Sequence, residues 1–256
     1  MTILQEFRPG LLLTEVQLPD FDVRGAIIIV EQRVVIWDSL SHPRDMQSVR
    51  ALLNASDCTL IYSHADWDHI WGTAGLLDEG KSIIGHVNCL ARFSQEASRE
   101  LHEKKTAQPG VWDEVILIPP TVTFQKSLSL NLGNLTLNLH HLPGHTSDCI
   151  VGFIPEWGVL LAGDTVETPF PVINVDSSID EWIAALQNWE RDERVQHVIP
   201  SHGVIGGREL LRQNISYLQN LRNGAPITLP EKLDDFYRET HQNNLRHSLA
   251  YNLKLI

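Results

Sequence analysis

The sequence is poor in cysteine and in basic residues. Only three cysteines occur among 256 residues, and Cys58, Cys89 and Cys149 lie far apart in the chain. An odd number of widely spaced cysteines argues against a disulfide framework and fits a reducing compartment. Twenty basic residues against 32 acidic ones leave a formal net charge of −12. A surface of this charge repels nucleic-acid phosphates and anionic lipids, so we expect neither nucleic acid nor a membrane as a partner.

Long apolar runs and targeting signals are also missing from the pattern. The first ten residues, MTILQEFRPG, lack the basic segment and apolar core of a signal peptide, and no apolar run approaches the roughly 20 residues of a membrane helix. These features predict a cytoplasmic protein with a small-molecule substrate, and they do not indicate an oligomeric state. Hydrophobic residues make up 43% of the chain and charged residues 20%, which are globular proportions. We expect a single domain over residues 1–256, with 225–256 as a C-terminal helical extension.

Short strands are predicted for the first half of the chain. The runs GAIIIV (25–30) and RVVIWD (33–38) flank Glu31 and Gln32, which indicates a hairpin without the usual Asn-Gly turn. CTLIYS (58–63) and SIIGH (82–86) are typical of buried strands, and helices are expected at 44–54 and 89–105.

The second half is predicted to contain more strands and then helices. Further strands are expected in the runs VILIPP, VTF, LSLNL, LTLNLHHLP, CIVGFIP and GVLLAGD, and a last one in HVIPSHG (197–203). The expected helices are 179–193, capped by Ser177 or Ser178, then 208–223 and 231–250. This order suggests two packed sheets with helices outside them.

Four polar motifs each follow an apolar strand. The first, YSHADWDHIWG (62–72), holds two histidines and two aspartates within six positions, and the others are LPGHTSD, LLAGDTV and IPSHG. The polar residues of interest are His64, Asp66, Asp68, His69, His145, Asp164 and His202. Side chains at strand ends project into the loop layer, where functional groups gather. A lone histidine or aspartate there is usually a hydrogen-bonded loop residue or a cap, but four such motifs in order favour a metal site.

As a set, these motifs resemble the metallo-β-lactamase superfamily. Its pattern is His-x-His-x-Asp-His, followed by histidine in Gly-His-Thr, aspartate in Gly-Asp-Thr and histidine in Gly/Ser-His-Gly. The resemblance runs from the hairpin near residue 25 to His202. It implies an α+β fold, an αββα four-layer sandwich of two mixed sheets flanked by helices, with a binuclear metal centre at one sheet edge. It would place His64, Asp66 and His145 on the first ion and Asp68, His69 and His202 on the second, with Asp164 bridging both.

One position, Asp66, departs from this pattern, which has histidine there. A carboxylate oxygen binds zinc at about the distance of an imidazole nitrogen, so Asp66 remains a possible ligand. Three carboxylates on two ions should make the metals weaker Lewis acids, and an oxygen ligand moves preference toward iron or manganese. We expect two divalent ions, with zinc first and iron or manganese as alternatives.

The resemblance implies a metal-dependent hydrolase in which a water or hydroxide bridging two ions attacks a small ester, thioester or lactone. Asp68 is the candidate catalytic residue, orienting the water, although a role as ligand alone is equally consistent with its position. β-Lactamases with a metal-binding cysteine match poorly, because no cysteine lies between Asp164 and His202. His241 is a candidate substrate contact on the C-terminal helix, which otherwise serves as a solvated cover of the core.

Three other functions stay open from the sequence. A diiron-type oxidoreductase of the same fold is the first, because redox relatives in the superfamily carry a carboxylate at the position of Asp66. The second is a β-lactamase-like amide hydrolase. The third is a non-catalytic metal-binding protein, although a degenerate site would be expected to have lost a ligand.

Overall fold

A computed structural model of the chain describes residues 2–53, 57–76 and 82–254. The chain divides into two compact units, Met1–Thr136 and Leu137–Ile256, which are called unit 1 and unit 2 below. The assignment of 1–256 to one domain with a helical extension at 225–256 stays a prediction. Within the described ranges, no helix combines the length and the apolar character needed to cross a membrane.

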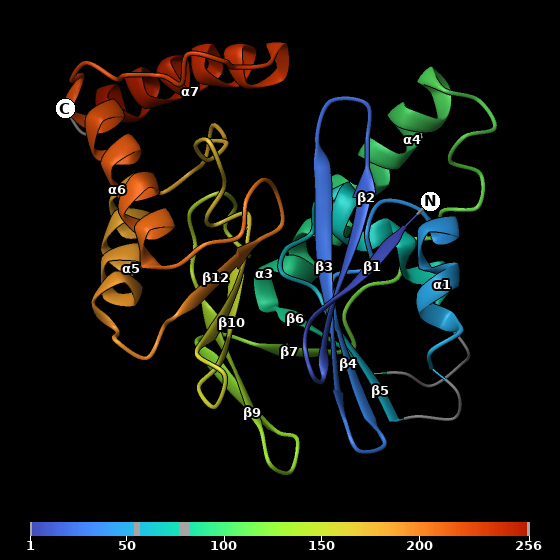
Figure 1. The fold of residues 1–256 in the computed structure, drawn as a ribbon. Helices are drawn as coiled ribbons and strands as arrows, with labels where there is room; N and C mark the ends of the chain where they lie inside the picture. Colours follow the sequence, from blue (N-terminus) through green and yellow to red (C-terminus); the bar gives the residue numbers. More distant parts are fainter. Residues whose placement is uncertain (1, 54–56, 77–81, 255–256) are drawn as a thin grey trace. The chain divides into compact units, whose positions relative to one another are not determined.

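Unit 1 contains a mixed seven-stranded sheet whose strands lie side by side in chain order (Figure 1). The strands are β1 (Ile3–Arg8), β2 (Leu11–Gln17), β3 (Asp22–Val30), β4 (Arg33–Trp37), β5 (Asp57–Ile61), β6 (Ser82–His86) and β7 (Val122–Phe124). Strands β1 to β4 pair antiparallel, whereas β4 to β7 pair parallel. The sequence analysis identified neither β1 nor β2.

The predicted hairpin is confirmed as β3 and β4. Val30 pairs with Arg33, which leaves Glu31 and Gln32 as a two-residue loop. Glu31 has a φ of 54°, the left-handed conformation that tight hairpin loops require. The runs of β-branched residues suit the extended backbone, and Val34 to Trp37 are all buried, as expected of a strand covered on both faces.

Short helices connect the remaining strands of unit 1. They are the 3₁₀ turn η1 (Pro43–Met46), α1 (Gln47–Arg50), α2 (Trp67–Ile70), the 3₁₀ turn η2 (Trp71–Gly75), α3 (Val87–Arg92), the π-helical turn η3 (Phe93–Ala97) and α4 (Ser98–Ala107). A further strand, β8 (Ser127–Asn131), follows β7. The α-helix predicted at 44–54 is shorter than expected, because residues 43–46 are 3₁₀ and the α-helical part ends at Arg50. The strand predicted at 115–120 is wrong, since that segment has no regular structure; its two prolines supply no N–H for a sheet ladder.

Unit 2 contains a second mixed sheet and three helices. Its strands are β9 (Thr136–His141), β10 (Ile150–Ile154), β11 (Val159–Gly163) and β12 (His197–Pro200), and its helices are α5 (Ile179–Arg191), α6 (Arg208–Asn223) and α7 (Asp235–Lys254). The order is β12-β11-β10-β9, with β11 and β12 parallel and the other pairs antiparallel.

Helices α5 and α6 cover one face of this second sheet. Ile179, Trp182, Ile183 and Leu186 of α5 are buried at helical spacing, and they join Val151 and Phe153 of β10 in one hydrophobic core with residues of α6. Helix α6 ends at the predicted residue, where Gly224 adopts the left-handed conformation (φ 63°) that closes many helices.

Strand direction gathers the polar motifs at one edge of each sheet. In unit 1, the parallel strands β4 and β5 end at the same edge, so Asp38 and His64, which follow them, are brought close. In unit 2, the end of β9, the start of β10 and the ends of β11 and β12 share one edge. The loops that carry His145, Asp164 and His202 therefore lie together.

Candidate metal centre

Unit 1 contributes His64, Asp66, Asp68 and His69, which we call the first cluster. His64 follows β5, Asp66 is the residue before α2, and Asp68 and His69 lie within α2. Both histidines are fully buried, and their ring centroids are 4.2 Å apart. The structure therefore brings the two imidazoles of this segment into contact.

Hydrogen bonds fix the tautomers of both histidines. Nδ1 of His69 lies 3.0 Å from Oδ2 of Asp38, and a carboxylate only accepts, so Nδ1 carries the proton. Ser63 Oγ donates its proton to Asp38 Oδ2 at 2.7 Å, so the Ser63 hydroxyl oxygen accepts from His64 Nδ1 at 3.0 Å. In both rings the Nε2 atom is therefore the one with a lone pair for a ligand.

Asp38 is the anchor of this arrangement. Its carboxylate also accepts from the backbone N–H of Ser63 at 2.7 Å, and the side chain is fully buried. Its φ of 61° is uncommon for a residue other than glycine. Three accepted hydrogen bonds hold this conformation in place, which is the pattern of local strain found at functional sites.

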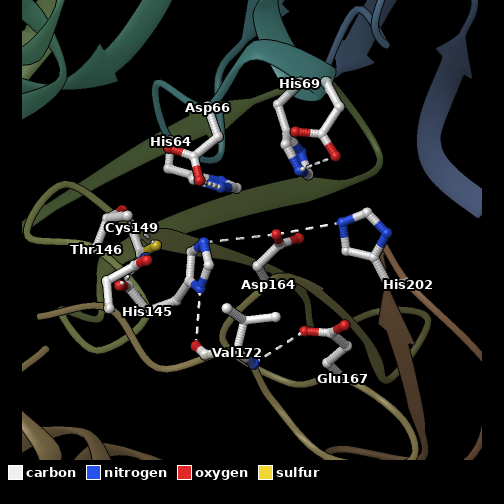
Figure 2. Close-up of polar contacts among 12 residues, drawn as sticks. His64, Asp66, His69, His145, Thr146, Cys149, Asp164, Glu167, Val172 and His202 are labelled. Carbon is white, nitrogen blue, oxygen red and sulfur yellow. Dashed lines mark hydrogen bonds and ion pairs between the residues drawn. The ribbon is translucent and has the colours of Figure 1, made fainter. Parts of the chain in front are cut away.

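Each aspartate of the first cluster faces an Nε2 atom. Oδ2 of Asp66 lies 3.4 Å from His64 Nε2 (Figure 2). Oδ2 of Asp68 lies 3.7 Å from His69 Nε2. Asp68 is buried, whereas 24% of the Asp66 side chain is exposed. Each histidine nitrogen is thus matched with one carboxylate oxygen.

Two tryptophans lie beside the first cluster, Trp67 in α2 and Trp71 in η2. The two rings are 5.9 Å apart, and Trp112 packs edge-on against both. The ammonium group of Lys104 lies 3.8 Å from the centre of the Trp67 ring, a cation–π contact that ties α4 to this loop.

Unit 2 contributes His145, Asp164 and His202, which we call the second cluster. Oδ2 of Asp164 lies 3.2 Å from Nε2 of His202 and 3.7 Å from Nε2 of His145, so one carboxylate oxygen faces both rings (Figure 2). All three side chains are buried. Within unit 2, the structure therefore brings these three motif residues together.

The loop of residues 165–174 orients His145. Nδ1 of His145 lies 3.0 Å from the carbonyl oxygen of Val172, so this ring also carries its proton on Nδ1. The backbone carbonyl of His145 accepts from Asn174 Nδ2 at 2.9 Å and from Ser177 Oγ at 3.1 Å. The predicted cap of α5 is confirmed at Ser178, which makes no side-chain cap hydrogen bond, whereas Ser177 supports His145.

Two glycines allow the ligand loops to approach their neighbours. A Cβ atom on Gly144 would lie 2.3 Å from the ring of Trp182, which a larger residue could not tolerate. Gly203 has a φ of 83°, and a Cβ atom there would lie 2.1 Å from Thr168 Oγ1. Each glycine is adjacent in sequence to a histidine of the second cluster.

Glu167 is a buried acid beside the second cluster. Its Oε1 accepts from the Tyr237 hydroxyl at 2.7 Å, and its Oε2 accepts from the backbone N–H of Val172 at 3.2 Å. Burial raises the pKa of Glu167 to about 7; Asp164 also raises it, whereas His202 lowers it. The carboxyl group thus connects the loop behind His145 to helix α7.

Helix α7 holds the same loop through its polar face. Asn244 is fully buried; its Nδ2 donates to the carbonyl of Pro171 at 2.8 Å, and its Oδ1 accepts from the N–H of Ile173 at 2.8 Å. Nδ1 of His247 lies 2.6 Å from the carbonyl of Ile173. The side chain of His241 is 8% exposed, and its Nδ1 lies 2.9 Å from the Tyr217 hydroxyl. The substrate contact expected of His241 stays a prediction.

The donor set of each cluster fits a divalent metal ion. Imidazole nitrogens and carboxylate oxygens are ordinary ligands of zinc, iron and manganese. In metal sites the ring nitrogen that does not bind the metal usually donates to a carboxylate or a backbone carbonyl. His69 and His145 make this second contact, with Asp38 and Val172. The assignment of individual ligands to two ions stays a prediction.

Three residues beside the clusters escaped the sequence analysis: Asp38, Arg92 and Glu167. Asp38 directly follows a strand in the run RVVIWDSL, so its position resembles that of the motif residues, but it belongs to no recognisable motif. Arg92 donates to Asp66 at 2.7 Å from the end of α3. Glu167 lies three residues after Asp164. Nothing in the sequence alone marks Arg92 or Glu167.

The chain matches the model of a known protein family. The family model of the metallo-beta-lactamase superfamily matches residues 23–202, a range that includes all seven residues of the two clusters. Among curated proteins, the metallo-beta-lactamase type 2 of Bacillus cereus is 26% identical over 188 residues, which cover 72% of this chain and 66% of the relative. That of Bacillus sp. (strain 170) is 25% identical with the same coverage. The chain thus spans slightly less than two thirds of the length of these relatives.

Solved structures show the same fold. A metallo-beta-lactamase from Pontibacter korlensis matches with a TM-score of 0.72 and 18% identity, covering 86% of this chain and 100% of the other. The metallo-beta-lactamase FIM-1 from Pseudomonas aeruginosa, in its mono-zinc form, matches with a TM-score of 0.67 and 18% identity, covering 86% and 95%. These similarities confirm the predicted α+β fold class with two mixed sheets and flanking helices.

Proposed function

Because the chain belongs to the metallo-β-lactamase superfamily, we propose that it is a metal-dependent hydrolase and that its two clusters together hold two divalent ions. One ion would be bound by His64, Asp66 and His145, and the other by Asp68, His69 and His202. Asp164 would contact both. Zinc is the first choice, with iron or manganese as alternatives, because the three carboxylates add hard oxygen ligands.

One observation carries the proposal. In three of the four histidines Nδ1 is held by a protein acceptor, and in all four Nε2 lies 3.2 to 3.7 Å from a carboxylate oxygen. Such an arrangement sets the ligand atoms before the metal arrives, which lowers the cost of ordering them on binding.

Metal ions held by these residues would polarise a scissile carbonyl and lower the pKa of bound water, so that hydroxide would be available as the nucleophile at neutral pH. The residues of the chain would supply the rest. Asp68 is buried beside His69, so we propose that its carboxylate orients the attacking water. Asp38, Ser63 and Val172 would keep the imidazoles in one tautomer through their hydrogen bonds.

We propose a small ester, thioester or lactone as the substrate. The β-lactam amide bond is the second candidate, and the names of the similar proteins from Bacillus favour it. Against it, the second cluster contains Asp164 rather than a cysteine, and Cys149, the cysteine nearest to His145 in the sequence, is buried with its Sγ 3.0 Å from Thr146 Oγ1. The mechanism needs no nucleic-acid or membrane partner. We propose a cytoplasmic location.

His241 remains the proposed substrate contact on α7. Its Nδ1 is already engaged by Tyr217, so a contact with substrate would use Nε2. An asparagine side chain can keep the hydrogen bond to Tyr217 while removing the Nε2 position, whereas glutamine reaches the position of Nε2. Comparison of these two substitutions therefore tests this role directly.

The experiment that tests the function has two steps. The protein is first purified without added metal and its bound metals are measured; two equivalents of zinc or manganese per chain are expected. The loaded protein is then assayed on matched thioesters, lactones, esters and β-lactams, with turnover of the first three expected to exceed that of β-lactams. Iron with visible absorbance and no hydrolysis would favour the redox alternative, and binding of no metal would refute the proposal.

A further inference from the structure

Arg92 contacts the one candidate ligand that departs from the family pattern. It is the last residue of α3, and its Nη2 donates to Oδ1 of Asp66 at 2.7 Å. Its Nε donates to Oε2 of Glu96 at 2.9 Å. The Arg92 side chain is 17% exposed and that of Asp66 is 24% exposed, so the ion pair is largely shielded from solvent. Shielding makes such a pair stronger than an open surface salt bridge.

The two oxygens of the Asp66 carboxylate have different partners. Oδ1 is bound to the guanidinium group, whereas Oδ2 lies 3.4 Å from Nε2 of His64. Rotation of the carboxylate would break the contact with Arg92. The arginine therefore holds Oδ2 on the side of the imidazole nitrogen that is set up to bind metal.

The pair also balances charge. An aspartate in place of the usual histidine adds one negative charge to the first cluster, and the guanidinium adds one positive charge beside it. Asp66 and Arg92 together are neutral, like the imidazole that they would replace.

We propose that Arg92 is a positioning residue for metal binding: it fixes Asp66 so that Oδ2 and His64 Nε2 present a single ligand pair. This inference rests on the proposed function, because it assigns Asp66 to a metal ion. It extends that function by explaining how an aspartate works at a histidine position. An aspartate at this position would then need an arginine on α3 to hold its carboxylate in the orientation that binds metal.

Arg92 is expected to affect metal affinity in two opposite ways. Its positive charge repels a nearby cation whatever residue occupies position 66, so its removal would tighten binding by that amount. Its hydrogen bond to Oδ1 holds the ligand in place, so its removal would weaken binding, but only when Asp66 is present. A double-mutant cycle separates the two effects, because the first cancels between the two backgrounds.

The experiment measures metal affinity in four proteins: the parent, Arg92→Met, Asp66→His and the double variant. Zn²⁺ and Co²⁺ affinities are obtained by competition with a chromophoric chelator, and Co²⁺ absorption reports the ligand geometry. In each background, the affinity without Arg92 is divided by the affinity with it. We expect this ratio to be at least roughly 10-fold lower with Asp66 than with histidine, since residues that hold ligands in place change affinity by 10- to 100-fold.

Two further variants serve as controls. Glu96→Gln removes the other partner of Arg92 without touching Asp66, and it should change metal affinity by less than about 3-fold. Arg92→Lys keeps the charge but loses the forked geometry, so a metal affinity below that of the parent would reflect the loss of positioning and not a change in charge. Urea unfolding of each apoprotein checks the fold, and if Arg92→Met does not fold, the cycle is run with Arg92→Lys.

The outcomes discriminate clearly. Equal ratios in the two backgrounds, within about 3-fold, would show that Arg92 acts only as a remote charge and would overturn the inference. A parent protein that binds no metal would instead refute the proposed function. A parent that binds two ions and hydrolyses substrate, with equal ratios, would leave that function standing without this role for Arg92.

Discussion

Replacement of Asn244 by alanine should destabilise the protein and weaken metal binding, although Asn244 lies on α7, far along the chain from every proposed ligand. Its amide donates to the carbonyl of Pro171 and accepts from the N–H of Ile173, both at 2.8 Å. The side chain is fully buried. Alanine would leave one buried backbone carbonyl and one buried N–H without this partner. Each such loss costs about 1–3 kcal/mol, so the free energy of unfolding should fall by about 2–6 kcal/mol.

Asn244→Ala should also change the second cluster, because it affects the backbone of residues 171–173. Val172 lies between the two residues that Asn244 holds, and its carbonyl accepts from Nδ1 of His145. If residues 171–173 move, this carbonyl moves with them and His145 loses its fixed orientation. Metal affinity should then fall by roughly 10-fold, the lower end of the effect of residues that orient metal ligands.

The assay pairs urea unfolding of the metal-free protein with chelator competition for bound Zn²⁺. Asn243→Ala is the matched control, because the Asn243 side chain accepts an exposed hydrogen bond from Arg246 at 3.0 Å. It should change the free energy of unfolding by less than about 0.5 kcal/mol. If Asn244→Ala lowers the free energy of unfolding by less than about 1 kcal/mol, the cost assigned to the buried Pro171 carbonyl and Ile173 N–H is wrong. A large loss of stability with unchanged metal affinity would refute the link to His145.

Three further predictions use the same chemistry. Asp164→Ala should lower the content of both ions and abolish hydrolysis; retention of two tightly bound ions, measured by elemental analysis, would contradict its bridging role. Burial raises the pKa of Glu167 from the ordinary 4.5 to about 7, so its contribution to the stability of the metal-free protein is complete below pH 4.5 and is lost as the pH rises through 7. Glu167→Gln should remove this dependence, so that the parent loses up to about 3 kcal/mol relative to the variant between pH 4.5 and 8 in urea unfolding, and parallel curves would count against it. His241→Asn should raise KM several-fold more than His241→Gln at equal metal content, whereas identical kinetics would return His241 to a structural role.

The sequence predicted those elements whose signals are local. The β-branched runs of β3 to β6 and the helical spacing of apolar residues in α5 and α6 need no information from elsewhere in the chain, and their positions were close to those observed. β1 was missed because most of its side chains are exposed, so no alternation of apolar residues marks it. The apolar residues of 115–120 predict a strand, but Pro119 and Pro120 supply no N–H for a sheet ladder, and the segment is irregular.

The same distinction between local and distant signals applies to the residues of the candidate site. The residues of the two clusters were predictable because each belongs to a short motif with chemistry of its own. Asp38 and Arg92 were not, because their roles depend on contacts with distant segments. Asp38 meets His69 across 31 positions, and Arg92 meets Asp66 across 26. Strand register sets the first contact, and the second depends on where α3 ends, just before a π-helical turn. Neither can be inferred from local sequence.

Two buried histidines outside the clusters, His42 and His86, have the opposite tautomer from His64, His69 and His145. In His42 and His86 both ring nitrogens serve the backbone: Nε2 lies 2.9 and 2.8 Å from a carbonyl oxygen, and Nδ1 accepts from a backbone N–H at 3.2 Å. These rings carry the proton on Nε2, as structural histidines that cap a helix or turn must. In His64, His69 and His145 the proton is on the other ring nitrogen: Nδ1 donates to a protein acceptor, and Nε2 faces a carboxylate. The acceptors of the Nδ1 proton differ between the units. In unit 1 they are the buried Asp38 and the Ser63 that donates to it, and in unit 2 the acceptor is the backbone carbonyl of Val172. The same tautomer in both units is the one that the proposed binding of metal through Nε2 requires.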